Sequence, residues 1–387
     1  MRLAPLQQRL QALGCKPCHA DRLLRGWLQI ASYDRVHSPA ENFFPLALRN
    51  ELPTLEAELN GLARLRSEHP AVGHKNHDQS PTLTLPRKTG EGTNAALRES
   101  ANNAGVSRLL VALHDGQMVE SVLLPRGGLC ISTQVGCAVG CVFCMSGRAG
   151  LIRQLDSLEI VAQVVLARRH RAVSKVVFMG MGEPAHNLDN VLEAIALLGT
   201  QGNIGHKNLV LSTVGDERVF ERLAQHLVKP ALAISLHSTD ATLRAQLLPN
   251  APPMSIEELI AHGEIYARAT GYPVQYQWTL IAGVNDSDAE IAGIARLLKD
   301  KYAMMNFIPF NAVDGLNFQR PSIERTEAMV TMLKQHGILA RIRDSAGQEI
   351  EGACGQLRAR AEKQNRSKKV SFTSSVEVAV PAANSME

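Results

Sequence analysis

The sequence has no apolar run long enough to span a lipid bilayer, which argues against a helical membrane protein. Its first residues also lack the basic n-region, long apolar h-region and small-residue cleavage site of a secretory signal. Nor is there a large excess of charge, and a net charge of +4 does not by itself identify a nucleic-acid partner. We therefore expect a soluble cytoplasmic protein without a membrane partner.

Cysteine is scarce and unevenly distributed. The chain of 387 residues contains seven cysteines, an odd number, and four of them lie between Cys130 and Cys144. A secreted protein that is cross-linked by disulfides is usually short and has an even number of cysteines. The clustering therefore favours metal chemistry in a reducing compartment.

The pattern of apolar residues divides the chain into four parts. Residues 1–65 have apolar positions at helical spacing and predict a small helical accessory domain, whereas residues 66–104 are polar, without a period, and predict a linker or insertion. Residues 105–357 form the core, and residues 358–387 form a basic and then disordered tail. Cys15 and Cys18 lie in the helical part, and we interpret their spacing as incidental, with zinc or redox chemistry as the alternative.

Short apolar runs alternate with helical patterns through the core. The runs are predicted as buried strands at residues 131–135, 175–179, 209–213, 231–236, 274–281 and 304–310. Ser255-x-x-Glu258 and Ser287-x-x-Glu290 have the form of capping boxes at the starts of two helices. This alternation of strands and helices predicts an α/β fold, specifically an incomplete (β/α)6 barrel. In such a barrel the active site lies at the carboxyl ends of the strands.

Cys137, Cys141 and Cys144 follow the first predicted strand in one short loop. The spacing Cys-x-x-x-Cys-x-x-Cys supplies three thiolates to a 4Fe–4S cluster and leaves one iron open to a ligand that is not protein. The alternatives are a tetrahedral zinc site that lacks its fourth ligand, or chance spacing.

Polar residues follow the later strands. Gly182 and Glu183 lie in a Met-Gly-Met-Gly-Glu-Pro loop, in which glycine allows close backbone approach and the carboxylate can accept from an ammonium group; the alternative is an ordinary glycine turn. Ser212 can bind ligand or merely satisfy backbone, and His237 can contact ligand or be a satisfied core histidine. The remaining candidates at the carboxyl ends of the predicted strands are Ser235, Leu236 and Asn311.

Five motifs occur together in a fixed order: the cysteine loop from Cys130, the loop of Glu183, Leu-Ala-Ile-Ser-Leu-His237, Ile-Pro-Phe-Asn311, and Gly-Ala-Cys354-Gly-Gln-Leu. Together they make residues 105–357 resemble the RlmN/Cfr radical methyltransferases, which modify adenine in RNA. The resemblance implies one 4Fe–4S cluster per chain and S-adenosylmethionine as cofactors. It also implies ribosomal or transfer RNA as substrate and a flavodoxin-type electron donor.

The resemblance further implies roles for three residues. Cys354 takes a methyl group from S-adenosylmethionine, and the carbon passes to an adenine ring carbon through a radical route. Cys130 resolves the protein–RNA adduct by forming a disulfide with Cys354. Glu120 matches the family's proton acceptor, although the stretch between it and Cys130 is shorter than in relatives. Of the two ring carbons, we favour carbon 2 over carbon 8.

The sequence leaves the RNA and other functional classes open. Loops after Cys144 and Ser212 depart from the family pattern, which is compatible with another RNA target. Two further alternatives are a radical enzyme acting on a protein or small molecule, and a non-enzymatic iron–sulfur protein. Basic residues at 168–171 and in the tail from Arg358 to Lys369 bind phosphate or are simply solvated. The oligomeric state stays open.

Overall fold

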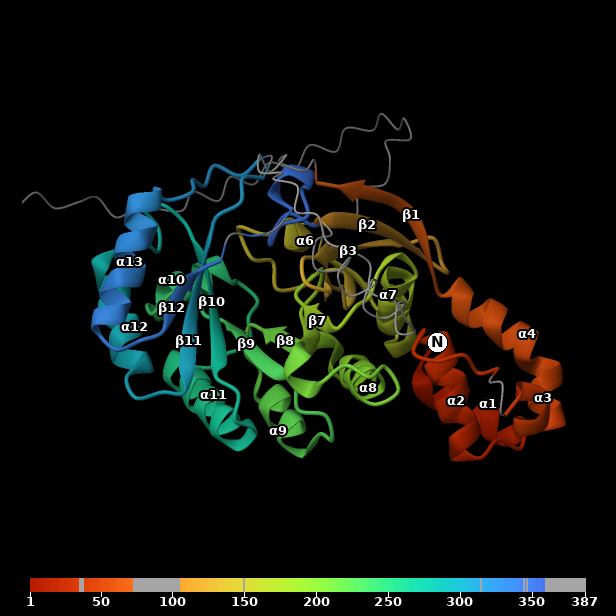
Figure 1. Cartoon of the computed structure of the whole chain (residues 1–387). Coiled ribbons are helices and arrows are strands. Elements are labelled where there is room, and N and C mark those ends of the chain that lie inside the picture. Colours follow the sequence, from red (N-terminus) through yellow and green to blue (C-terminus); the bar gives the residue numbers. More distant parts are fainter. Residues whose placement is uncertain are drawn as a thin grey trace, which may run out of the picture.

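The computed structural model describes residues 1–34, 38–71, 105–148, 150–313, 315–343, 345 and 347–358. These residues form one ten-stranded mixed sheet with helices packed on its outer side (Figure 1). Its strands lie in the order β1-β2-β3-β4-β7-β8-β9-β10-β11-β12, while β5 and β6 form a separate two-stranded ribbon. None of the described helices is long and apolar enough to cross a membrane.

β4 and the strands from β7 to β12 pair in parallel and form the barrel wall. They span Gly128–Cys130 (β4), Lys175–Phe178 (β7), Leu209–Thr213 (β8), Ala231–Ser235 (β9), Val274–Leu280 (β10), Ala303–Pro309 (β11) and Ala340–Ile342 (β12). The outer helices are Ser157–His170 (α7), Leu188–Gly199 (α8), Glu217–Gln225 (α9), Ala241–Leu247 (α10), Ile256–Thr270 (α11), Asp288–Leu298 (α12) and Ile323–Gln335 (α13). Because the sheet does not close on itself, the predicted incomplete α/β barrel is confirmed.

Local sequence signals explain where the outer helices begin. Ser255 accepts a hydrogen bond from the backbone N–H of Glu258, whose carboxylate binds back, so the predicted capping box of α11 is present. Ser287 likewise caps α12. Glu290, however, accepts hydrogen bonds from Ser238 and Thr239 in place of closing a box, and so connects α12 to the loop after β9.

The first predicted strand, at residues 131–135, is wrong in position. The chain leaves the sheet at Cys130, and the short strand β5 (Gln134–Gly136) pairs with β6 (Leu151–Gln154). Ile131 N still donates to Val177 O at 3.0 Å, but Thr133 N donates to Met181 O, in the loop beyond β7. Apolar content marks this segment as buried without showing that its backbone changes partners.

Four strands of the sheet were not predicted from the sequence. β1 (Ala63–Pro70), β2 (Ser107–Leu113) and β3 (Met118–Leu124) form an antiparallel meander beside β4, and β12 is the strand at the opposite edge of the sheet. Residues 66–70 of the predicted linker therefore lie in β1, and residues 72–104 are outside the described residues. β1 escapes detection because it is an edge strand whose outward residues Arg64, Arg66 and Glu68 are exposed and polar.

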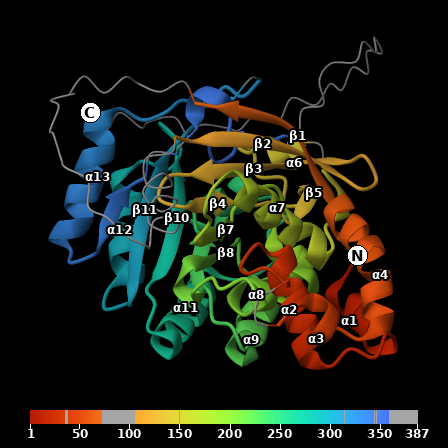
Figure 2. The ribbon, with the colours of Figure 1, turned by 45° about the vertical axis from the view of Figure 1, so that its right-hand side comes forward.

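Four helices precede the sheet: Leu3–Ala12 (α1), Pro17–Trp27 (α2), Ala40–Phe43 (α3) and Leu46–Gly61 (α4). Figures 1 and 2 show them at one side of the barrel, next to α7 and α8. The Met1 ammonium donates to Asp156 at 2.7 Å, and Leu3 N donates to Ser157 Oγ. The four-part division at residues 65, 104 and 357 stays a prediction, and residues 359–387 are outside the described part.

Two arginines of the basic run at residues 168–171 bind the protein's own backbone. Arg168 donates to Leu28 O at 2.9 Å and to Gly202 O at 2.7 Å, and Arg171 donates to Leu124 O and Gly105 O. Burial lowers the pKa of Arg168 to about 10. Both expectations for these two residues, phosphate binding and simple solvation, are therefore wrong, and Arg168 connects the N-terminal helices to the barrel.

We expect Arg168→Ala to lower the free energy of unfolding by about 2 kcal/mol, because hydrogen bonds from a charged donor to buried carbonyls are lost. Arg222→Ala is the matched control, since Arg222 is half exposed and pairs with the exposed Asp189. Its loss should change stability by less than about 1 kcal/mol. Urea unfolding measures both, and equal stability changes would contradict the connecting role of Arg168.

Candidate active site

The three-cysteine loop is held in a tight conformation by its glycines. Gly136 and Gly140 have φ values of +80° and +68°, in the left-handed region that glycine adopts without strain. A Cβ on Gly136 would lie 1.9 Å from Gly150 O, so that position requires glycine. Cys137 N donates to Gly150 O, and Cys144 N donates to Cys141 O at 3.0 Å. The loop thus presents its thiols from a fixed backbone.

The three thiols influence one another's ionisation. Burial, with smaller contributions from the charges of Glu183 and Cys144, raises the pKa of the Cys137 thiol to about 12. The pKa of Cys141 is raised well above its usual range by burial and by the other two cysteines. Buried thiols that must ionise together need a cationic partner, which an iron–sulfur cluster supplies.

The spacing of these thiols is compatible with a cluster. Within the described ranges, no three cysteine, histidine or acidic side chains are close enough to bind a single metal ion. In a cubane, however, each thiolate binds a different iron, so the thiols stand further apart than the ligands of one ion. Cys137, Cys141 and Cys144 are the residues that fit such a cluster.

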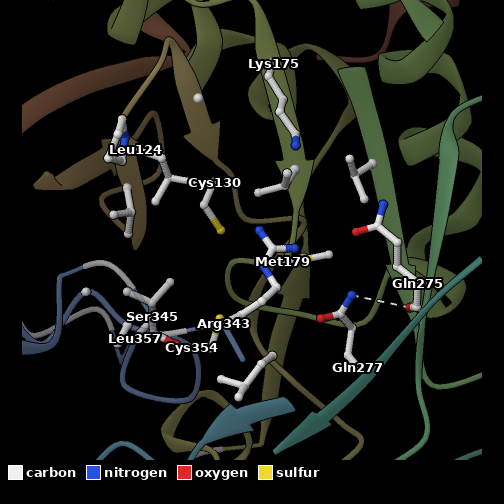
Figure 3. A pocket seen from close by; sticks show the side chains of 18 of the residues that line it. Leu124, Cys130, Lys175, Met179, Gln275, Gln277, Arg343, Ser345, Cys354 and Leu357 are labelled. Carbon is white, nitrogen blue, oxygen red and sulfur yellow. Dashed lines mark hydrogen bonds between the residues drawn. The ribbon is translucent and has the colours of Figure 1, made fainter. Parts of the chain in front are cut away.

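Cys130 and Cys354 lie close together in the barrel. Both line one pocket, as Figure 3 shows, and its volume is about 440 Å³. Cys130 ends β4, whereas Cys354 lies near the end of the described chain. Burial is the main cause that raises the pKa of Cys130 and of Cys144, and the charge of Cys354 adds a smaller contribution to both. No disulfide joins any of the seven cysteines, all of which are described.

The segment around Cys354 is attached to the cysteine loop by hydrogen bonds. Met145 N donates to Gly355 O at 2.8 Å, and Ser146 Oγ donates to Leu357 O at 2.7 Å. Asn311, at the end of β11, donates to Cys354 O at 3.0 Å. The Asn311 amide oxygen is buried and has no partner among the described residues, so it is available to a ligand. Asn311 therefore positions Cys354 through its amide nitrogen and offers its amide oxygen to a ligand.

Glu120 lies buried in β3, on the face that carries Val122 and Leu124 into the pocket. Its carboxylate accepts a hydrogen bond from Arg108 Nη1 and another, of 2.8 Å, from the backbone N–H of Arg358. Glu120 thus connects β3 to the segment that follows Cys354. The tail residues beyond Arg358, including the basic ones, are outside the described part.

Gly182 and Glu183 follow β7. Gly182 has a φ of +105°, and a Cβ there would lie 2.6 Å from the Gln134 side chain, so this loop conformation requires glycine at residue 182. Glu183 accepts hydrogen bonds from Ala185 N and Val214 N, both of 3.0 Å. Burial raises the pKa of its carboxyl to about 7, against the lowering effect of these bonds. The carboxylate joins two strand-end loops and keeps lone pairs for a cationic ligand.

His237 lies directly above the cysteine loop. Its ring packs edge-on against Phe143, with a centroid distance of 4.9 Å, and its Nδ1 accepts from Thr279 N at 2.9 Å. The proton is therefore on Nε2. A φ of +61° is uncommon for a non-glycine residue. Leu236 is fully buried, whereas Ser212 and Ser235 are partly exposed at the ends of β8 and β9.

The structure also brings together pocket residues that the sequence analysis missed. Lys175 from β7, Met179 directly after β7, Gln275 and Gln277 from β10, and Arg343 after β12 line the pocket with Cys130 and Cys354 (Figure 3). The period of two along a strand would have found Lys175, Val177 and Met179 on one face. Nothing in the sequence indicates that Arg343 lies opposite them.

Comparison with known proteins gives consistent matches. The model of the radical SAM superfamily matches residues 131–296. A probable RNA methyltransferase of Methylibium petroleiphilum is 63% identical over 361 residues, covering 93% of this chain and 94% of that protein. One of Azoarcus sp. is 61% identical over 366 residues, covering 95% and 96%. The crystal structure of a radical SAM methyltransferase from Sphaerobacter thermophilus matches with a TM-score of 0.73 and 33% identity, covering 93% and 98%.

We expect His237 to make stability depend on pH. Burial, and secondarily Arg244, lower the pKa of the imidazole to about 3, whereas it titrates near 6.5 in an unfolded chain. Below pH 6.5 the unfolded state therefore gains a proton that the folded state does not, and stability falls as the pH decreases. Between pH 7 and pH 5 this costs about 2 kcal/mol.

His237→Asn should remove that part of the pH dependence, because asparagine can still accept from Thr279 N but does not titrate. Urea unfolding at pH 7, 6 and 5 measures it. His336→Asn, at an exposed position, is the control and should retain the wild-type slope. An unchanged slope in His237→Asn would show that the imidazole titrates normally in the fold.

Proposed function

Because the chain belongs to the radical SAM superfamily and, within it, to the RlmN/Cfr-like methyltransferases, we propose that it methylates an adenine ring carbon of RNA. The proposal names ribosomal RNA, or transfer RNA, as the substrate and carbon 2 as the acceptor. The observation that supports it most is the position of Cys354, which faces Cys130 in one pocket and adjoins the cysteine loop.

Cys137, Cys141 and Cys144 are proposed to hold the 4Fe–4S cluster. Glu183, with the strand-end residues Gly182, Ser212, Ser235, Leu236, His237 and Asn311, is proposed to bind S-adenosylmethionine. When bound, the reduced cluster and this cofactor supply a radical that can remove a hydrogen atom from an unactivated methyl group. A reductant of the flavodoxin type is proposed to supply the electron.

Cys354 is proposed to carry the methyl group. As a thiolate it displaces that group from S-adenosylmethionine, so that a sulfur–carbon bond forms and S-adenosylhomocysteine leaves. After the carbon has lost a hydrogen atom and bonded to adenine, protein and RNA are covalently joined. Release then requires a second thiol, and Cys130 is in the same pocket.

Cys130 is proposed to attack the sulfur of Cys354. The adduct would first give up one electron to the oxidised cluster and the proton of the ring carbon to a base. The bond between that sulfur and the transferred carbon then breaks, and the carbon keeps the electron pair and takes up a proton to become the methyl group. A Cys130–Cys354 disulfide forms, and an external thiol reductant restores both cysteines. Burial and the neighbouring Cys354 raise the pKa of Cys130, which keeps this thiol protonated until the step requires it. Glu120 is proposed as the proton acceptor at the adenine carbon, on the β3 face beside the pocket.

We expect Cys354→Ala to abolish methyl transfer to RNA, because no thiolate remains to carry the carbon. The assay is anaerobic reconstitution with methyl-labelled S-adenosylmethionine and total cellular RNA, followed by mass spectrometry of nucleosides. The variant should still cleave the cofactor when reduced, because the cluster ligands are intact. Cys18→Ala, at an exposed site in the helical part, is the control and should leave transfer unchanged. Methyladenosine formed by Cys354→Ala would refute the covalent route.

Cys130→Ala should stop the reaction one step later. The adduct forms but has no thiol to resolve it, so RNA should remain attached to the peptide that contains Cys354. Nuclease digestion followed by peptide mass spectrometry detects the attached nucleotide. Repeated turnover by Cys130→Ala, without an adduct, would exclude the resolving role.

A further inference from the structure

The pocket beside Cys130 and Cys354 is lined by cationic, amide and apolar side chains from the barrel interior. Its volume of about 440 Å³ is within the range of about 300–1,000 Å³ for small-molecule sites. None of Gly182, Glu183, Ser212, Ser235 and His237 is among its lining residues. It is therefore distinct from the site proposed for S-adenosylmethionine, and its occupant must be explained separately.

Lys175 and Arg343 line this pocket without a counter-ion among the described residues. Lys175 opens β7 and Arg343 follows β12, and burial, together with the charge of Arg343, lowers the pKa of Lys175. No carboxylate is among the described lining residues, and neither side chain forms an ion pair with any described residue. The other ionisable residues described there are Arg126, which adds a third cation, Cys130 and Cys354. Two like charges held together favour an anionic ligand between them.

An amide with unused hydrogen-bonding capacity lies across from these cations. Gln277 is 5% exposed and donates one Nε2 hydrogen to Gln275 O at 3.3 Å. Its Oε1 has no partner among the described residues, and Figure 3 shows the amide directed into the pocket. A glutamine amide can accept from the amino group of adenine and donate to an adjacent ring nitrogen.

The remaining walls are apolar and suit the faces of a planar base. Val177, Val210 and Ile308 come from three different strands of the barrel and line the same pocket as the amide and the thiols. An enzyme that modifies a ring atom must take the base out of its stack, and apolar walls offset part of the lost stacking energy.

We propose that this pocket binds the target nucleotide of RNA in a flipped-out conformation, with a backbone phosphate on Lys175 and Arg343 and the edge of the adenine on Gln277. This inference rests on the proposed function, since it assigns the substrate to the site of methyl transfer. Phosphate binding fixes the depth of insertion, and Gln277 orients the ring so that one carbon faces Cys354. Lys175, Arg343 and Gln277 are therefore substrate-binding residues.

The test begins with binding, which does not depend on catalysis. Reconstituted protein is titrated with total cellular RNA by filter binding at several salt concentrations. Lys175→Gln and Arg343→Gln should each weaken binding about tenfold and lower the salt slope by about one ion. Lys334→Gln, on the exposed face of α13, is the control cation and should change neither quantity. Lys175→Arg should retain wild-type binding, because it keeps the charge.

The second readout separates substrate binding from cofactor chemistry. Methylation of Cys354 by labelled S-adenosylmethionine in the absence of RNA should proceed at the wild-type rate in all of these variants, which also shows that they fold. In the RNA reaction, the two cation variants should raise KM about tenfold with kcat nearly unchanged. Gln277→Leu should lower kcat/KM between about tenfold and a hundredfold, because the base loses its orienting contact.

Two results in the Lys175→Gln, Arg343→Gln double variant would overturn the inference. One is RNA affinity and a salt slope equal to those of the wild type. The other is loss of Cys354 methylation, which would assign the two cations to cofactor binding. The proposed function fails on a different result. If wild-type protein binds RNA through Lys175 and Arg343 but forms no methyladenosine, the pocket assignment stands and methyl transfer is refuted.

Discussion

The attachment of residues 352–358 to the turn after the cysteine loop is the constraint on which the site depends. Ser146 and Leu357 are 211 residues apart in sequence, yet a 2.7 Å hydrogen bond joins them. With the bonds from Met145 and Asn311, it holds Cys354 between the loop and β4. Glu120 fixes the far end of the segment through Arg358 N. Without these contacts the segment that carries Cys354 would be free to move away from the other cysteines.

Two electrostatic environments meet at Cys354. On one side, buried thiols and Glu183 surround the cysteine loop, where the proposed cluster and cofactor, both cationic, would compensate for the cost of burying thiolates. On the other side, Lys175 and Arg343 face a pocket without a carboxylate among its described lining residues, which suits a phosphate. In the proposed reaction, the donor and the acceptor of the methyl group would therefore be attracted to opposite sides of one thiol.

The sequence predicts the parts of this arrangement that depend on local pattern. Alternating strands and helices identified the barrel, and motif order identified the family, because both signals lie within short windows. The edge strand β1 and the three-residue strand β12 were missed, since one is polar and the other too short to show a period. Arg343 and Gln277 carried no signal, because their residue types are usual on surfaces. Only the fold brings them opposite Lys175, and the nearness of Cys354 to Cys130 came from resemblance, not from pattern.

The most direct test of the account is the distance between those two thiols in the loaded protein. With the cluster in place, Cys137, Cys141 and Cys144 are occupied as ligands, so Cys130 and Cys354 are the barrel cysteines left to react. Anaerobic titration with oxidised glutathione, in a variant with Cys15 and Cys18 replaced by serine, should give one disulfide between the peptides of Cys130 and Cys354. Mixed disulfides with glutathione at Cys354, and none between the two cysteines, would show that the thiols do not meet and that the proposed covalent route is wrong.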